Sequence, residues 1–167
     1  MTHRDDDGRS NALAGYDALC SMVAALKCDY DRLEELRQKL KDFENEHGYR
    51  STNAELAELE RRAGECKDQD EAYERILEDA LNVEVRSAWH EVGGDATPSE
   101  FAILLTTGGP ALRLRGELDE HSEPSRAWLE YQDWGTPWTE LVTDADGEAV
   151  QQRILLTYAK CFYFGEG

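Results

Sequence analysis

The sequence predicts an α+β protein: an N-terminal antiparallel helical hairpin, then a four-stranded antiparallel sheet with a C-terminal helix. Apolar residues recur every three or four positions up to Leu81, which is typical of amphipathic helices. From Asn82 the spacing changes to strict alternation, which is typical of strands. Short turns rich in Gly and Pro separate the later runs, and such turns join antiparallel strands, because parallel pairing needs a long crossover.

The chain of 167 residues is long enough for one ordinary domain. We divide it into a polar tail over residues 1–11, a helical hairpin over 12–82, and the sheet with its C-terminal helix over 83–167. The tail is charged and free of aromatic residues, so we expect it to be disordered. The other two parts are expected to pack as one unit.

The first predicted helix runs from Ala12 to Glu46 as one long amphipathic helix of coiled-coil type, ended by Gly48. The second is capped by Ser51, Thr52 or Asn53, of which Thr52 forms a capping-box pattern with Glu55, and it continues to Leu81. Within it, Gly64 lowers helix stability by about 1 kcal/mol relative to alanine.

Four strands are predicted over residues 83–90, 101–107, 111–118 and 125–133, followed by a helix over 148–162. In the third strand, Leu112 and Leu114 are expected to point inward and Arg113 and Arg115 outward. We expect Trp89 to be buried. At least one of Trp134 and Trp138, which lie in a loop with Gly and Pro, should be partly exposed.

The chain is strongly acidic, with 36 Asp and Glu against 18 Lys and Arg and a net charge of −18. Residues 117–148 hold ten acids and the single base Arg126. Such a charge repels nucleic acid and anionic membrane surfaces and attracts basic surfaces. The composition therefore favours a basic protein partner over direct binding to nucleic acid or membrane, although solubility alone is also a common reason for acidity.

No complete catalytic signature is present, and we predict a non-enzymatic protein without catalytic residues, cofactor or metal. The four cysteines contain no CxxC pair, and Gly108-Gly109-Pro110 lacks the lysine of a phosphate loop. The N-terminus has no apolar signal core, so a cytoplasmic location is expected. Asp119-Glu120-His121 leaves open an alternative, a small metal-dependent enzyme.

Aromatic and acidic side chains alternate in the second half, a composition suited to gripping Lys and Arg on a partner. The predicted partner-binding residues are Glu117, Asp119, Glu120, Glu123, Glu130, Asp133, Trp134 and Trp138.

The second half resembles an uncharacterised family of small acidic proteins carried by bacterial plasmids, prophages and other mobile elements. The resemblance rests on four runs: TGGPA (107–111), RGELDEH (115–121), AWLEYQDWGTPW (127–138) and FYFGE (162–166). The family offers no catalytic residues to carry over. It implies an anti-defence inhibitor, anti-CRISPR or anti-restriction, that binds the nucleic-acid-binding surface of a CRISPR effector or restriction enzyme, with DNA mimicry as one route. An oligomeric regulatory or structural accessory protein, homodimeric through the first helix, stays open.

Overall fold

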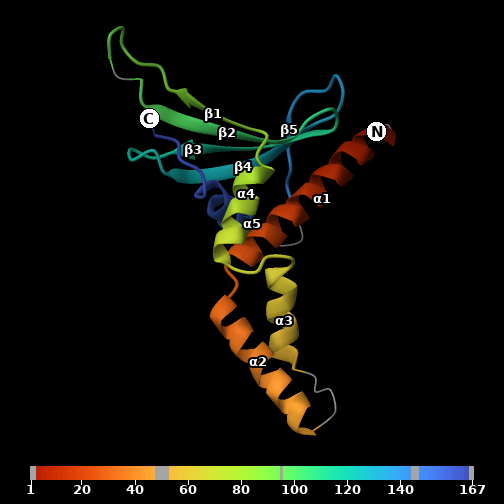
Figure 1. The fold of residues 1–167 in the computed structure, drawn as a ribbon. Coiled ribbons are helices and arrows are strands. Elements are labelled where there is room, and N and C mark those ends of the chain that lie inside the picture. The colour runs from red at the N-terminus through yellow and green to blue at the C-terminus, as the bar shows by residue number, and fades with distance from the viewer. Residues whose placement is uncertain (1–2, 48–52, 95, 144–146, 166–167) are drawn as a thin grey trace. The chain divides into compact units, whose positions relative to one another are not determined.

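The computed structural model describes residues 3–47, 53–94, 96–143 and 147–165 (Figure 1). Within them the protein is α+β, with five helices and an antiparallel sheet of five strands. Two compact units divide the chain: a sheet unit, residues 1–20 with 76–167, and a helical unit, residues 21–75. The predicted division lay between residues 82 and 83. The structure differs, because residues 1–20 and residues 76–82 belong to the sheet unit.

The single long first helix is wrong: the chain forms α1 (His3–Leu26) and α2 (Tyr30–His47) instead. The interruption lies at Asp29, whose Oδ1 accepts a hydrogen bond of 2.9 Å from the backbone N–H of Arg32, in the manner of an N-cap. The expected disordered tail is also wrong over residues 3–11, since α1 begins at His3. The predicted stop at Gly48 lies outside the described residues.

The second predicted helix is likewise two helices, α3 (Ala54–Ala63) and α4 (Gln69–Asp79). Asn53 caps α3 by accepting from two backbone N–H groups, which confirms one of the three predicted caps, whereas Ser51 and Thr52 lie outside the described residues. Gly64 follows α3 with a φ of 59°, a left-handed value that favours glycine. The isolated glycine therefore ends the helix.

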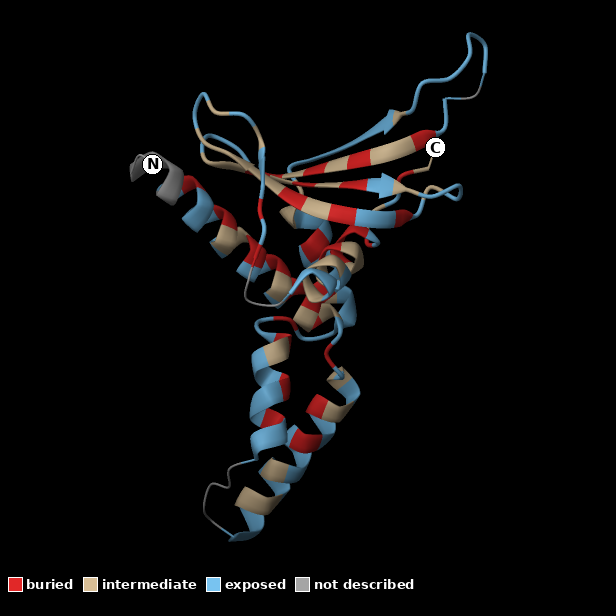
Figure 2. Ribbon diagram, turned by 180° about the vertical axis from the view of Figure 1, so that it is seen from behind, coloured by how far each residue is buried: buried red, intermediate tan, exposed pale blue. Residues whose placement is uncertain are grey.

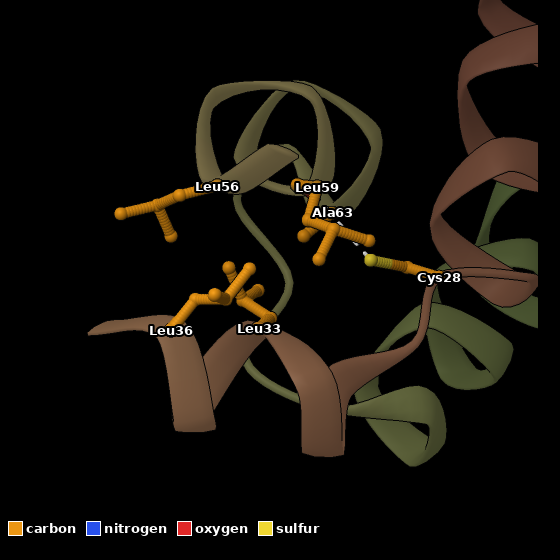
Figure 3. Packing of buried hydrophobic residues seen from close by; sticks show 6 residues of the cluster. All are labelled: Cys28, Leu33, Leu36, Leu56, Leu59 and Ala63. Carbon is orange, nitrogen blue, oxygen red and sulfur yellow. Dashed lines mark hydrogen bonds between the residues drawn. The ribbon is translucent and has the colours of Figure 1, made fainter. Parts of the chain in front are cut away.

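The helical unit has its own apolar core, formed where α2 and α3 pack as an antiparallel pair (Figure 3). The buried residues are Cys28, Leu33, Leu36, Leu56, Leu59 and Ala63. Arg32 joins the two helices at their surface through Glu55, with Nη2 2.9 Å from Oε2. The predicted hairpin is thus realised by α2 and α3.

The sheet contains β1 (Asn82–Ser87), β2 (Pro98–Thr106), β3 (Ala111–Leu118), β4 (Pro124–Gln132) and β5 (Thr139–Glu140). They lie in sequence order and every neighbouring pair is antiparallel, so the predicted meander is confirmed. The short β5 was not predicted. α5 (Glu148–Ala159) follows, and its predicted extent to 162 is three residues too long.

One face of the sheet is the core of the sheet unit. Its strands contribute Phe101, Ile103, Leu114 and Leu129, and α5 contributes Leu155 and Tyr158, all fully buried. α1 also covers this face: Gly15 approaches Leu112 so closely that a Cβ would lie 2.4 Å from it. Buried and less buried residues alternate along these strands (Figure 2). Alternation places the charged residues of β2, β3 and β4 on the opposite face, which we call the outer face.

Trp89 contradicts the sequence prediction, because its side chain is completely exposed. The predicted first strand ran to His90, which would have placed Trp89 in the core-facing row. In the structure β1 ends at Ser87, and Trp89 lies in the loop that leads to β2.

Candidate functional site

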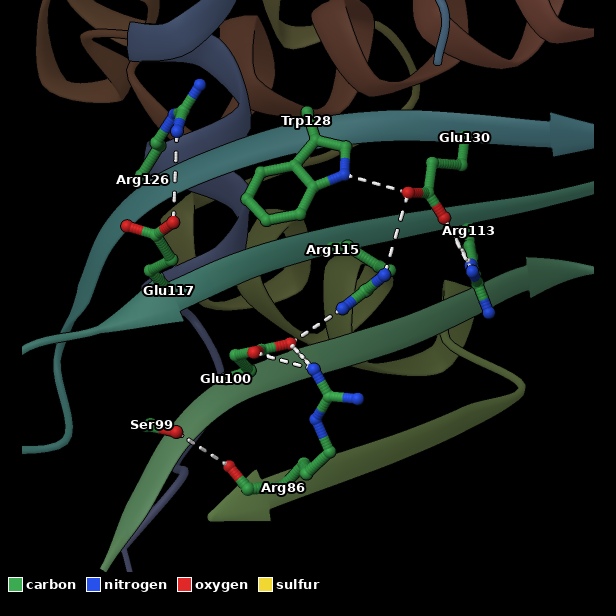
Figure 4. A network of polar contacts seen from close by, with 9 residues as sticks. All are labelled: Arg86, Ser99, Glu100, Arg113, Arg115, Glu117, Arg126, Trp128 and Glu130. Carbon is green, nitrogen blue, oxygen red and sulfur yellow. Dashed lines mark hydrogen bonds and ion pairs between the residues drawn. The ribbon is translucent and has the colours of Figure 1, made fainter. Parts of the chain in front are cut away.

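The outer face carries a row of alternating charges that crosses four strands, which we call the outer network (Figure 4). It contains Arg86 from β1, Glu100 from β2, Arg113 and Arg115 from β3, and Glu130 from β4. Together with Arg126, these arginines are four of the six Lys and Arg in residues 76–167. With Arg4 and Arg9 counted, half of the eight Lys and Arg in the sheet unit lie on one face.

Each carboxylate in the outer network is shared between two arginines. Arg86 Nη2 lies 2.6 Å from both oxygens of Glu100, and Arg115 Nη2 lies 2.6 Å from Glu100 Oε2. Arg115 Nη1 also reaches to 3.7 Å from Glu130 Oε1. The two guanidinium groups lower the pKa of Glu100, chiefly through the hydrogen bond from Arg86.

Glu130 has both oxygens engaged inside the sheet. Arg113 Nε donates to Oε2 at 2.7 Å, and Trp128 Nε1 donates to Oε1 at 3.0 Å. Its side chain is only 14% exposed. Glu130 therefore holds strands together, and its place does not favour the predicted role in binding a partner.

The tryptophans of the second half differ in their surroundings. The Trp128 ring lies 5.5 Å from the guanidinium of Arg115 and 5.7 Å from that of Arg126, within cation–π range. Arg113 stacks at 4.0 Å over Trp138, which is half-buried. Trp134 is 75% exposed, as predicted for one of the loop tryptophans, and rests on Gly109. Of the two predicted contact tryptophans, Trp134 is the accessible one.

The β3–β4 turn carries four of the predicted acidic residues, and we call it the acidic turn: Glu117, Asp119, Glu120 and Glu123. Asp119 Oδ1 accepts from the backbone N–H groups of His121 and Glu123, at 2.8 and 3.0 Å. These hydrogen bonds lower the pKa of Asp119 and make its carboxylate part of the turn's structure. The side chains of Glu120 and Glu123 are exposed, and Glu117 lies 3.8 Å from Arg126.

The eight predicted residues do not form one site. The acidic turn lies at the start of β4, whereas Asp133, Trp134 and Trp138 follow its other end. A nine-residue strand separates the two groups by about 30 Å. The chain therefore has two candidate contact surfaces, one acidic and one centred on Trp134, with the outer network between them.

The alternative prediction, a metal site at Asp119-Glu120-His121, has no supporting cluster of ligands in the described part of the chain. Within the described residues, no three His, Cys, Asp or Glu side chains are placed to hold a metal ion. His121 Nε2 lies 3.5 Å from Glu120, but both side chains are highly exposed and Asp119 is occupied by the turn's backbone. His90 lies in the β1–β2 loop, away from these residues in the strand order.

A cavity of about 280 Å³ lies beside β4 and α5. Its polar side chains already serve the backbone around it: Gln151 donates to the carbonyl of Leu141, and Gln152 to that of Ala127. Thr143, which is buried, donates to Gln151. The cavity wall therefore holds the β5–α5 segment against β4 and leaves none of these three groups directed at a ligand.

Sequence reasoning missed the outer network, although one signal for it was present. Alternation correctly placed Arg113 and Arg115 on the outward side of their strand. What pairs them is the register, Arg113 opposite Glu130 and Arg115 opposite Trp128, which depends on turn geometry.

Within the described residues, no helix is long and apolar enough to cross a membrane. Comparisons with protein-family models, with curated proteins and with solved structures find no match to this chain.

Proposed function

We propose that this protein acts by binding rather than by catalysis, and that its acidic turn contacts a basic, nucleic-acid-binding surface of a host defence complex. In this role it is an anti-defence inhibitor, anti-CRISPR or anti-restriction. The observation that carries the proposal is the unequal use of charge in the sheet unit: Arg86, Arg113 and Arg115 form ion pairs across the strands, while carboxylates such as those of Glu120 and Glu123 remain exposed.

The acidic excess is concentrated in the sheet unit. Residues 1–20 and 76–167 hold 21 acids and 8 bases, a net charge of −13, whereas residues 21–75 hold 15 acids and 10 bases, a net charge of −5. Four of those eight bases lie on the outer face, where carboxylates hold them. The cations that act on the acidic turn are Arg126, which lies 3.8 Å from Glu117, and Lys160, whose charge acts on Asp119.

Charge of this sign and density favours partners that ordinarily bind phosphate. Such partners hold clusters of Lys and Arg, and carboxylates can replace phosphates as their counter-charges. Electrostatic attraction also speeds encounter and weakens as salt rises. The resemblance expected from the sequence of the second half, to proteins of mobile elements, favours a defence complex as the partner, since mobile elements meet restriction and CRISPR systems on entering a host.

The proposal is tested by phage plating. Hosts that each carry one defined CRISPR effector or restriction enzyme are challenged with a sensitive phage, with and without expression of this chain. We expect plating to rise in at least one such host and to stay constant in a host without the defence system. Unchanged plating across a panel of both classes of system would contradict the proposal.

A further inference from the structure

The open edge of β1 carries exposed apolar side chains and is flanked by others. β1 pairs with β2 on one side, and within the described residues no strand pairs with its other side. Large apolar side chains are exposed along it and just beyond its ends: Leu81, Val83, Val85, Trp89 and Val92. Natural proteins usually shield such an edge, because its backbone groups can pair with another chain.

The backbone groups that face the open edge can be assigned. The carbonyl of Arg86 accepts a hydrogen bond from Ser99 Oγ on β2, so Arg86 directs its backbone toward β2. In an antiparallel ladder the direction alternates along the strand. Glu84 therefore also faces β2, and the N–H and C=O groups of Val83, Val85 and Ser87 face outward.

We propose that this edge binds a second copy of the same chain, strand β1 against strand β1, antiparallel about a two-fold axis at Val85. In this register Val85 lies opposite Val85 of the second copy, and Val83 lies opposite Ser87 of the second copy. These are the residues whose backbone groups face outward, so the two edges form hydrogen-bonded pairs. The two sheets join into one, with both outer faces on the same side.

The side chains of the strand are complementary to themselves in this register. Glu84 lies opposite Arg86 of the second copy, and the two-fold axis repeats the ion pair. These two residues form a non-hydrogen-bonded pair, in which side chains approach most closely. Leu81 precedes β1 and Trp89 follows it, so antiparallel pairing brings the strand end that carries the exposed Leu81 beside the end of the second copy that carries the exposed Trp89. A parallel, in-register pairing would instead place Glu84 opposite Glu84.

The contact does not require the acidic turn, and it differs from dimerisation through the first helix. Its register makes a sharp prediction for single cysteines under mild oxidation. Val85→Cys places two sulfur-bearing residues opposite each other, with Cα atoms about 5.5 Å apart, within the range that a disulfide spans. Val83→Cys is the matched control: it has the same side chain and face, but its two copies are about 14 Å apart along the strands.

We expect Val85→Cys to give a disulfide-linked dimer well above the wild-type background from the four native cysteines, and Val83→Cys to remain at that background. A mixture of Val83→Cys with Ser87→Cys should cross-link, because these two positions face each other. Equal cross-linking of Val85→Cys and Val83→Cys, or none above wild type, would overturn the proposal.

Mass measured by sedimentation over a range of concentrations gives an independent test. The wild-type chain should pass from monomer to dimer. Val85→Pro removes an outward N–H and should shift that transition to higher concentration without lowering the melting temperature much, since edge strands tolerate proline. Glu84→Pro removes an N–H that faces β2 and should lower the melting temperature more. A wild-type chain that is monomeric throughout, or a Val85→Pro dimer as stable as wild type, would contradict β1 pairing.

Discussion

Arg113 and Glu130 form an ion pair across β3 and β4, with Arg113 Nε 2.7 Å from Glu130 Oε2 and side chains that are 25% and 14% exposed. The two residues are direct partners in the strand register. The pair also anchors the Trp128 indole and, through Arg113, the Trp138 ring. The outer network is thus part of how the sheet holds together.

Replacing Glu130 by alanine should destabilise the fold, because it leaves Arg113, Arg115 and the Trp128 N–H without their shared acceptor. We expect a loss of about 2 kcal/mol in the free energy of unfolding, measured by denaturant titration. Glu123→Ala removes an exposed carboxylate from the same hairpin and should change the free energy by less than about 0.5 kcal/mol. Equal losses for Glu130→Ala and Glu123→Ala would show that the outer network does not contribute to the free energy of unfolding.

Stability should depend on pH through Glu100. Arg86 and Arg115 lower its pKa, so it contributes stability above its unfolded pKa, near 4.5, and that stability is lost as pH falls through the lowered value. The difference in unfolding free energy between wild type and Glu100→Gln should therefore be largest near neutral pH and shrink in acid. A difference that stays constant from about pH 7 to about pH 3 would rule out this ion pair as the cause.

Asp119 shapes the acidic turn through its hydrogen bonds to two backbone N–H groups. Asp119→Ala should lower the melting temperature, with a cost of about 1 kcal/mol. Asp119→Asn keeps an acceptor oxygen and should retain most of the stability while it removes the charge. The pair of variants separates the structural role of Asp119 from any role in binding, and similar melting temperatures for both would contradict the structural role.

Gly109 supports the exposed Trp134 ring. Its φ is 77°, and a Cβ would lie 2.1 Å from Trp134 Nε1, so Gly109→Ala should displace the ring as well as strain the backbone. Gly108→Ala carries only the backbone cost of about 1–2 kcal/mol, because a Cβ at Gly108 has open space. Tryptophan emission should change for Gly109→Ala alone, and that change should vanish when Trp134 is replaced by Phe.

The sequence was sufficient where one local pattern decides the structure. The antiparallel order of the strands followed from short turns, and the inward place of Leu112 and Leu114 from alternation; both are confirmed. The broken helices show where a continuous apolar pattern misleads. The apolar period passes through residues 27–29 and 64–68, but Asp29 and Asp68 cap the starts of new helices, and the left-handed Gly64 ends α3.

The candidate site was harder to predict because its parts depend on register and exposure. Nothing local distinguishes Glu130, which is held by Arg113, from Glu123, which is exposed. The end of β1 likewise decided the place of Trp89: a strand three residues longer would have kept it in the core-facing row. Pairings between distant segments settle such questions, and a single sequence does not contain them.

The most direct test of the proposed function is charge reversal within the acidic turn, in a host whose defence system this chain inhibits. Glu120→Lys with Glu123→Lys changes the charge by four units and spares Asp119 and Glu130, which support the fold. The matched control is Glu34→Lys with Glu46→Lys, the same change at exposed positions of α2. We expect the turn variant to lose the rise in phage plating that the wild-type chain gives, and the control to keep it. Both variants should have melting temperatures close to that of the wild type. Equal plating by the two variants would contradict binding through the acidic turn.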